Sequence, residues 1–295
     1  MTDFQNRWVA YVGLISAMFL WGGSFIALKI AFRSYDPMVV ICGRMIVASL
    51  CFMFFLKRFS GTRFRKTDLK YLIFMVLCEP CLYFIFEAKA LENTSASQAG
   101  IIVSMLPLMV AVAARAFLKE HISRKSLTGF VAAMVGAVGL SLTAGVSENA
   151  PNPALGNLLQ FVAMICATGY VVTLKRLTFN LSPFFLTAMQ ALAGTGFYLV
   201  LLFLPSTTLP SRFDPTATLA VVYLGAFVTL GAYGLYNFGL SRIPATQASS
   251  FVNLIPVFTI LLDWIVFGEQ LRLVQYTAAA LILVGVLVSQ EKSHI

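Results

Sequence analysis

The chain has 295 residues, of which 59% are hydrophobic and only 11% are charged, and its mean hydropathy is +0.85. Soluble domains carry about 25% charged residues, so this composition excludes an ordinary water-soluble domain and indicates a polytopic membrane protein. The net charge of +9 does not indicate nucleic-acid binding, because the basic residues flank apolar segments.

Ten apolar runs of about 20 residues follow one another, and each is long enough to cross a bilayer. The sequence therefore predicts an all-α integral membrane protein with ten transmembrane helices. The first run has no small-residue cleavage site after its apolar core and has a counterpart later in the chain, so we interpret it as a span rather than a signal peptide. In chain order the predicted spans are 8–31, 37–57, 69–88, 95–116, 124–143, 153–174, 182–204, 216–238, 245–267 and 272–290.

One stretch of the chain occurs twice. Ala90–Leu108 and Gly239–Val257 align without a gap at a shift of 149 positions, and the first two spans match the sixth and seventh at a shift of 146. We call residues related by these shifts repeat equivalents. The pattern predicts two five-span repeats, 8–143 and 153–290. Because five is odd, the second repeat enters the membrane from the opposite side, and a binding site is expected near the midplane between the two.

The distribution of Lys and Arg predicts the orientation. With the N-terminus in the cytoplasm, fifteen of the 21 Lys and Arg residues lie on the cytoplasmic side, five lie outside, and Arg44 falls within the second span. The positive-inside rule therefore places both termini in the cytoplasm. We expect a multi-pass protein of the cell inner (cytoplasmic) membrane.

At this point the chain resembles a known family. The ten spans in two halves, the early LWGGSF (Leu20–Phe25), and the small residues, proline and terminal glutamate (Glu120, Glu269) that close the fourth and ninth spans are similar to the drug/metabolite transporter superfamily, in particular its EamA-type ten-helix exporters. This resemblance implies a secondary transporter that exports amino acids or similar small metabolites by alternating access. It also implies a central cavity lined by the first, third, fourth, sixth, eighth and ninth spans.

Two other functions stay open. A flippase for a lipid or lipid-linked precursor belongs to the same superfamily and would need a lateral opening and a charged headgroup pocket. A membrane enzyme is disfavoured, because the sequence contains no GxxxxGK[ST], GxSxG, HExxH or Cys/His cluster. We therefore expect no catalytic residue, metal or cofactor; the expected partners are a small metabolite, the lipid bilayer and a proton. The chain is expected to act as a monomer or homodimer.

Two ionisable residues fall within predicted spans, where such groups are candidates for function. Glu79 lies about 16 Å into the third span and Arg44 about 10 Å into the second, at similar depths. Three roles are open: a structural Arg44–Glu79 ion pair, Glu79 as a proton or cation site, and Arg44 as an anchor for a substrate carboxylate. Glu87 lies near the outer end of the third span and is expected to be interfacial.

Neutral side chains complete the predicted site. We assign Pro107 and Pro256 to kinks in the fourth and ninth spans, because each removes a backbone donor in mid-helix. The polar candidates either line the cavity or hold neighbouring helices together through hydrogen bonds. The aromatic candidates either line the cavity or pack between helices. The candidates are Trp21, Tyr83, Gln98, Ser104, Tyr170, Tyr233, Tyr236, Gln247 and Asn253. For the transport cycle, we expect spans 1–4 to rock against spans 6–9.

The predicted orientation has a direct test. An enzyme reporter that is active only in the cytoplasm, fused after Ile295, should be active, since both termini are expected inside. A reporter that is active only outside, fused at the same residue, is the control and should be silent. The reverse pattern would contradict the predicted topology.

Overall fold

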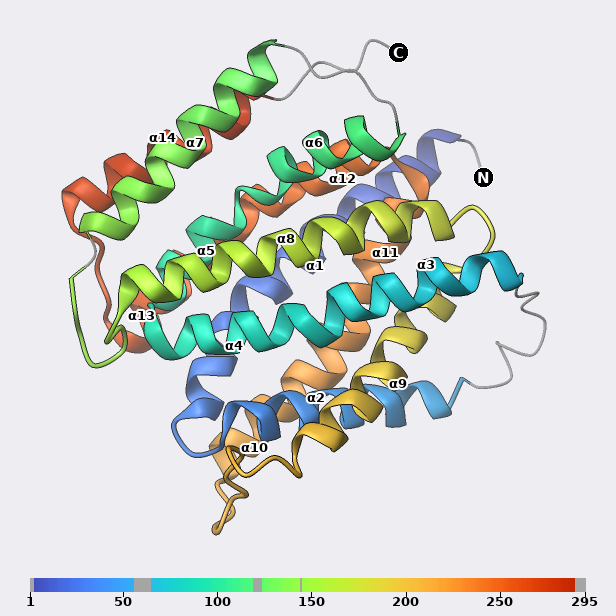
Figure 1. Ribbon diagram of the computed structural model, residues 1–295, viewed down its shortest axis with the longest axis horizontal. Coiled ribbons are helices and arrows are strands. Elements are labelled where there is room, and N and C mark those ends of the chain that lie inside the picture. The colour runs from blue at the N-terminus through green and yellow to red at the C-terminus, as the bar shows by residue number, and fades with distance from the viewer. Residues whose placement is uncertain (1–2, 56–64, 119–123, 144, 290–295) are drawn as a thin grey trace.

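The computed structural model describes residues 3–55, 65–118, 124–143 and 145–289 (Figure 1). Within these ranges the structure consists of helices and their connections, with one isolated β-bridge between Ser147 and Ala150. Seven described stretches are long and apolar enough to cross a bilayer, and α2 and the first part of α14 are apolar but shorter. The predicted all-α membrane fold is confirmed. The helices are α1 (Asp3–Phe32), α2 (Pro37–Met53), α3 (Lys66–Val76), η2 (Leu77–Leu82), α4 (Tyr83–Asn93), α5 (Ala96–Val103), α6 (Leu106–Leu118), α7 (Arg124–Thr143), α8 (Pro153–Leu177), α9 (Pro183–Leu201), α10 (Pro215–Tyr223), η3 (Leu224–Ala232), α11 (Tyr233–Arg242), α12 (Ala245–Ser250), η4 (Phe251–Leu254), α13 (Ile255–Phe267) and α14 (Leu273–Ser289).

Several spans are interrupted at equivalent places in the two repeats. The third span comprises α3, the π-helical η2 and α4, and the eighth comprises α10, the π-helical η3 and α11. These two spans, Lys66–Asn93 and Pro215–Arg242, correspond end to end at the shift of 149. The fourth and ninth spans break just before their prolines, so that Pro107 and Pro256 are the second residues of α6 and α13. A proline is tolerated there because a first-turn N–H has no intrahelical partner.

Local sequence explains where four of the spans begin. Each begins with a polar residue followed directly by a proline, whose fixed φ suits the first helical position. The polar side chain accepts a hydrogen bond from a backbone N–H of the first turn, which would otherwise lack a partner. These cap–proline pairs are Asp36–Pro37, Asn152–Pro153, Ser182–Pro183 and Asp214–Pro215.

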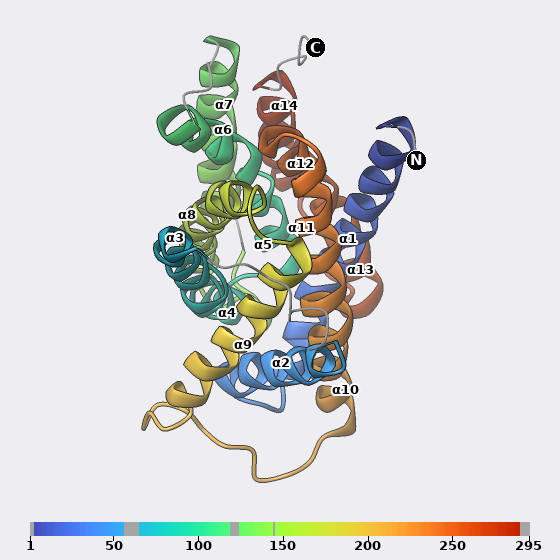
Figure 2. The same ribbon diagram turned by 90° about the vertical axis from the view of Figure 1, so that its right-hand side faces the viewer.

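The first and sixth spans are exchanged between the repeats. α1 packs against α10, α11 and α13 of the second repeat, whereas α8 packs against α3, α4 and α6 of the first. We call α3–α6, η2 and α8 group A, and α1, α10–α13, η3 and η4 group B. The groups meet where α5 contacts α13 and α6 contacts α12. α7 and α14 pack mainly on each other, at the opposite edge of the bundle from α2 (Figures 1 and 2).

A hydrogen bond between repeat equivalents marks the axis that relates the halves. Ser49 of α2 and Thr195 of α9 correspond at the shift of 146, and their hydroxyl oxygens lie 2.9 Å apart. Residues that are equivalent under a two-fold operation meet only on its axis. The axis between the repeats therefore passes between α2 and α9.

The close crossing of η3 over α2 depends on Gly225. A Cβ at this position would lie 2.5 Å from the Cβ of Val47 and 2.8 Å from the carbonyl oxygen of Arg44. We predict that Gly225→Ala destabilises the protein by about 1–3 kcal/mol through overpacking. Thermal unfolding in detergent measures this.

Gly234→Ala is the matched control, because nothing lies within 4 Å of its added Cβ. Its melting temperature should stay the same or rise slightly, since alanine favours a helix over glycine. Equal melting temperatures for the two variants would contradict the close packing.

Candidate functional site

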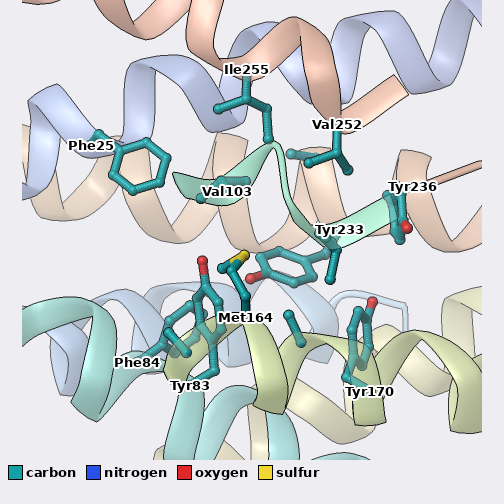
Figure 3. Close-up of a cluster of buried hydrophobic side chains, with 14 of the residues drawn as sticks. Phe25, Tyr83, Phe84, Val103, Met164, Tyr170, Tyr233, Tyr236, Val252 and Ile255 are labelled. Atoms are coloured by element: carbon teal, nitrogen blue, oxygen red, sulfur yellow. The ribbon is translucent and has the colours of Figure 1, made fainter. Parts of the chain in front are cut away.

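A small cavity lies between the two repeats, with a volume of about 40 Å³. It is lined by α1, α2, η2, α4, α5, α6, α8, α11, η4 and α13, which includes all six spans that the family resemblance implies and adds the second through Arg44. Figure 3 shows Tyr83, Met164 and Tyr233 directed toward one another, with Val252 and Ile255 beyond them. The cavity is therefore built from both group A and group B.

The break in the third span is centred on Glu79. Because Pro80 follows, the backbone of Glu79 is driven out of the helical region, and its φ and ψ are −150° and 119°. Side chains of α9 bond carbonyl groups at this break. The Tyr198 hydroxyl donates to the carbonyl oxygens of Pro80 (3.0 Å) and Cys81 (2.7 Å), and Gln190 Nε2 lies 3.5 Å from that of Glu79. This non-helical turn presents the Glu79 side chain to the cavity.

Two carboxyl groups and one guanidinium share the cavity, and all three are almost fully buried. The hydroxyl of Tyr233 donates to Oε1 of Glu79, and that of Tyr83 donates to Oε1 of Glu87 at 2.6 Å. Arg44 donates through Nε to Thr229 Oγ1 (3.1 Å), and its guanidinium carbon lies 4.3 Å from the centroid of the Phe84 ring. The described residues therefore contain a charged cluster whose members are held mainly by hydroxyl groups and aromatic rings.

The direct Arg44–Glu79 ion pair is not formed in this conformation. Within the described chain, Arg44 hydrogen-bonds Thr229 and Glu79 hydrogen-bonds Tyr233, each on the opposite repeat. Depth along the helix had suggested the pair, but stacking on Phe84 directs the guanidinium elsewhere. Arg44 still lies within electrostatic range of both Glu79 and Glu87.

Aromatic side chains enclose this cluster. The Trp21 ring packs against Tyr233 and Tyr236, with centroid separations of 5.0 and 4.9 Å. The Tyr170 hydroxyl donates to Oδ1 of Asn237. The indole N–H of Trp21 and the hydroxyl of Tyr236 are buried and have no hydrogen-bond partner among the described residues. Five predicted aromatic residues thus line the cavity, and two of them carry an unused polar group.

Four other predicted residues do not line the cavity. Gln98 accepts from Asn157 Nδ2 at 2.9 Å and so joins α5 to α8, and the Ser104 hydroxyl, just after α5, donates to the Ile101 carbonyl of that helix. Gln247 is exposed and bonds the Tyr11 hydroxyl, and Asn253 is half-buried in η4. In this conformation the structure thus places these four residues outside the cavity, in contacts of their own.

Glu87 is the main residue that the sequence interpretation missed. It was expected at the membrane interface because the third span was taken to end at residue 88. The span continues to Asn93, so Glu87 is buried in its interior. The available signal was its repeat equivalent, Tyr236, which the sequence had already placed in the site.

Polar contacts tie groups A and B together beyond the cavity at both ends of the bundle. Where α1 ends, Asp263 Oδ2 of α13 accepts from the Ser97 backbone N–H (2.8 Å) and hydroxyl (2.6 Å) at the start of α5. Lys29, also buried there, donates to the Asn149 carbonyl before α8. At the opposite end, Lys175 of α8 donates to the carbonyls of Leu240 and Ile243, each at 2.8 Å.

The two lysines that make these contacts are repeat equivalents. Lys29 lies within electrostatic range of two carboxylates, Asp263 and Glu269. Glu269 follows the end of α13; burial raises the pKa of its carboxyl group, and the charge of Asp263 adds to the effect, while Lys29 and hydrogen bonds from Ser95 and Asn149 oppose it. At each end of the bundle, a lysine of one repeat thus donates to a backbone carbonyl on the other side of the boundary.

Two inverted helical repeats around a buried polar cavity, closed at both ends, are the architecture of a membrane transporter. The chain belongs to the EamA-like transporter family, whose profile matches residues 8–142 and 154–289. This places it in the drug/metabolite transporter superfamily, as its sequence had suggested.

Similar proteins span nearly the whole chain. The uncharacterized transporter YetK of Bacillus subtilis (strain 168) is 25% identical over 289 residues, covering 95% of this chain and 86% of its own. An uncharacterized transporter of Archaeoglobus fulgidus is 25% identical over 288 residues, covering 98% and 100%. A protein of known crystal structure has the same fold, with a TM-score of 0.69 at 20% identity, over 96% of this chain and 95% of its own.

The Tyr198 hydroxyl should stabilise the break at Glu79. Tyr198→Phe removes the hydroxyl donor that the buried carbonyls of Pro80 and Cys81 share, and we predict a loss of about 1–3 kcal/mol of stability. Thermal unfolding in detergent measures the loss. Tyr276→Phe on α14 is the control, because Tyr276 is exposed and its hydroxyl has no hydrogen bond in the described chain. Equal melting temperatures for the two variants would show that the Tyr198 hydroxyl does not stabilise the break.

Proposed function

We propose that this transporter exports an amino acid or a similar small zwitterionic metabolite across the cytoplasmic membrane by alternating access. The observation that carries the proposal is the composition of the central cavity. One guanidinium, two carboxyl groups and an aromatic enclosure lie together where the repeats meet.

The three charged side chains match the two ends of an amino acid. Arg44 donates within the described chain only through Nε, so its terminal N–H groups are available to a substrate carboxylate. Glu79 and Glu87 together can accept an ammonium group. Since one guanidinium faces two carboxyl groups, the site has room for a second positive charge, which either a proton or the substrate ammonium supplies. Trp21 and Tyr236 would contact the substrate side chain.

The cavity volume indicates a closed conformation. About 40 Å³ holds roughly three water molecules, which is too little for an amino acid. The polar contacts of Asp263 with Ser97 and of Lys175 with Leu240 and Ile243 join groups A and B at the two ends. Opening toward either side therefore requires one set of these contacts to separate.

The packing favours a particular division into moving parts. Because α1 packs with the second repeat and α8 with the first, we propose that group A rocks against group B, instead of spans 1–4 against spans 6–9. The hydrogen bond from Tyr233 to Glu79 crosses the boundary between the two groups. Substrate or proton binding at Glu79 would compete with this bond and so loosen the closed state.

Three further features belong to this proposal. Both termini lie in the cytoplasm, as the Lys and Arg distribution favours. A proton is the coupling ion, and Glu79 carries it. The transporting unit is one chain, alone or within a homodimer, because the cavity is enclosed by residues of a single chain.

Glu79→Gln tests the coupling role. The amide has nearly the shape of a protonated carboxyl group and can still accept from Tyr233, so counterflow exchange in liposomes should persist. Accumulation driven by a proton gradient should fall at least tenfold, because the variant cannot release a proton. A panel of labelled amino acids provides the substrates for both assays. Glu92, an exposed residue of the same span, provides the control: Glu92→Gln should keep both activities.

Two outcomes would distinguish a role of Glu79 in proton coupling from a purely structural role. If Glu79→Gln accumulates substrate under a proton gradient as well as wild type does, Glu79 does not carry the coupled proton. Misfolding of Glu79→Gln, with folding restored by Arg44→Ala and Glu79→Ala together, would instead assign the two residues a structural role.

A further inference from the structure

A second cavity lies away from the transport site. It has a volume of about 380 Å³ and is bounded by α3, α6 and α8. Phe74, Ala113 and Val172 provide an apolar surface within it, and Lys70, Tyr71 and Arg176 are gathered at one end. We call this cavity the side groove. It combines a long apolar surface with a positively charged mouth.

The side groove and the central cavity lie on different faces of α8. Successive helical residues are rotated by about 100°, so residues 168, 172 and 176 form one stripe, and residues 164, 167 and 171 form another. The first stripe lines the side groove and the second lines the central cavity. A molecule in the side groove is therefore separated from the transport site by the helix itself, and the flippase alternative gains no pathway from it.

Among the residues that the structure describes, the two cations at the mouth of the groove have no acidic partner. The guanidinium carbon of Arg176 lies 4.1 Å from the centroid of the Tyr71 ring, and Lys70 Nζ lies 5.0 Å from it. Within the described part of the chain, neither side chain forms a salt bridge or hydrogen bond. Both are exposed. A guanidinium and an ammonium beside one ring form a suitable site for a phosphate group, which each can contact through several N–H donors.

The mouth lies at a membrane–water interface. Lys70 is in the second turn of α3 and Arg176 is in the last turn of α8, and these helix ends are joined by a hydrogen bond from Asn180 to Asp68. The apolar surface runs from there toward the middle of the membrane, since Phe74 and Val172 are each one turn deeper. In the proposed orientation this end faces the cytoplasm. A headgroup at the mouth would thus have its acyl chains at the depth of the apolar surface.

We propose that the side groove binds one anionic phospholipid of the cytoplasmic leaflet. Its phosphate lies between Lys70 and Arg176, and one acyl chain follows Phe74, Ala113 and Val172. All three helices of the groove belong to group A, so the lipid fastens that group to the leaflet and leaves the contact between the groups free. The lipid is a bound component of the transporter and is not its substrate.

Native mass spectrometry of the purified full chain tests the proposal. The protein in detergent is titrated with phosphatidylglycerol or with phosphatidylcholine of the same acyl chains, and the fraction carrying one lipid gives the affinity. Wild type should retain phosphatidylglycerol preferentially. Lys70→Gln with Arg176→Gln should bind it about thirtyfold more weakly, since each basic residue near an anionic headgroup contributes about a fivefold effect.

Arg242→Gln is the matched control. Arg242 is another exposed arginine at the same end of the bundle, 5.0 Å from the centroid of the Phe238 ring, but it does not line the groove. Its affinity for phosphatidylglycerol should equal that of wild type. An equal loss in Arg242→Gln and in the double variant would overturn the site, because it would reveal diffuse attraction to a basic surface. Unchanged retention in the double variant would overturn it as well.

Ala113→Phe tests the acyl chain separately. The ring would fill the groove while leaving both cations in place, so lipid retention should fall at least fivefold. Inorganic phosphate at equal concentration should not displace the lipid. Wild-type retention by Ala113→Phe, or displacement by phosphate, would mean that the basic mouth binds anions without the groove. If the double variant does not fold, Arg176→Gln alone should show a fivefold loss, and its absence would overturn the proposal.

Discussion

The backbone of a membrane-spanning helix cannot be interrupted without a replacement for each lost hydrogen bond, because the bilayer core supplies no water. This protein interrupts its third and eighth spans beside the central cavity and bonds both breaks with side chains. In the third span, Tyr198 and Gln190 of α9 bond the carbonyls around Glu79. In the eighth, the Thr229 hydroxyl donates to the Leu224 carbonyl and accepts from Arg44 of α2. The position of Glu79 and the burial of Arg44 both follow from this requirement.

The two repeats share this framework but differ in charge. Arg44 and Gln190 are repeat equivalents, and each bonds the break in the opposite repeat. Glu79 corresponds to Val228, and Glu87 corresponds to Tyr236. All three charged residues of the cavity therefore come from the first repeat, whereas the second contributes amide, aliphatic and aromatic side chains at the same places. The symmetric framework creates the cavity, and the departures from symmetry determine its chemistry.

The order of the spans, the repeats and the depth of Glu79 could be predicted, because hydropathy, sequence shift and helical rise depend on the chain alone. The aromatic lining could also be identified, since it lies within strongly apolar spans. The direction in which an individual side chain points could not be predicted from the sequence. Gln98 and Ser104 have the right depth but face other partners, and this depends on helix rotation within the bundle. Glu87 was misplaced for a different reason, because hydropathy falls near Lys89 although the helix continues to Asn93.

The hydroxyl contact between Ser49 and Thr195 has a consequence for the origin of the chain. In a pair of identical five-span proteins inserted in opposite orientations, this position would face its own copy across the axis. A hydroxyl suits that position because it can donate and accept at once, so two copies satisfy each other without any change in sequence. Joining the copies in one polypeptide keeps this contact, as Ser49 and Thr195 do at 2.9 Å, while allowing every other position to evolve separately. A serine and a threonine that meet on the axis are the contact that two such self-associating copies would make, and a single polypeptide allows Arg44 to differ from Gln190 one turn and a half away.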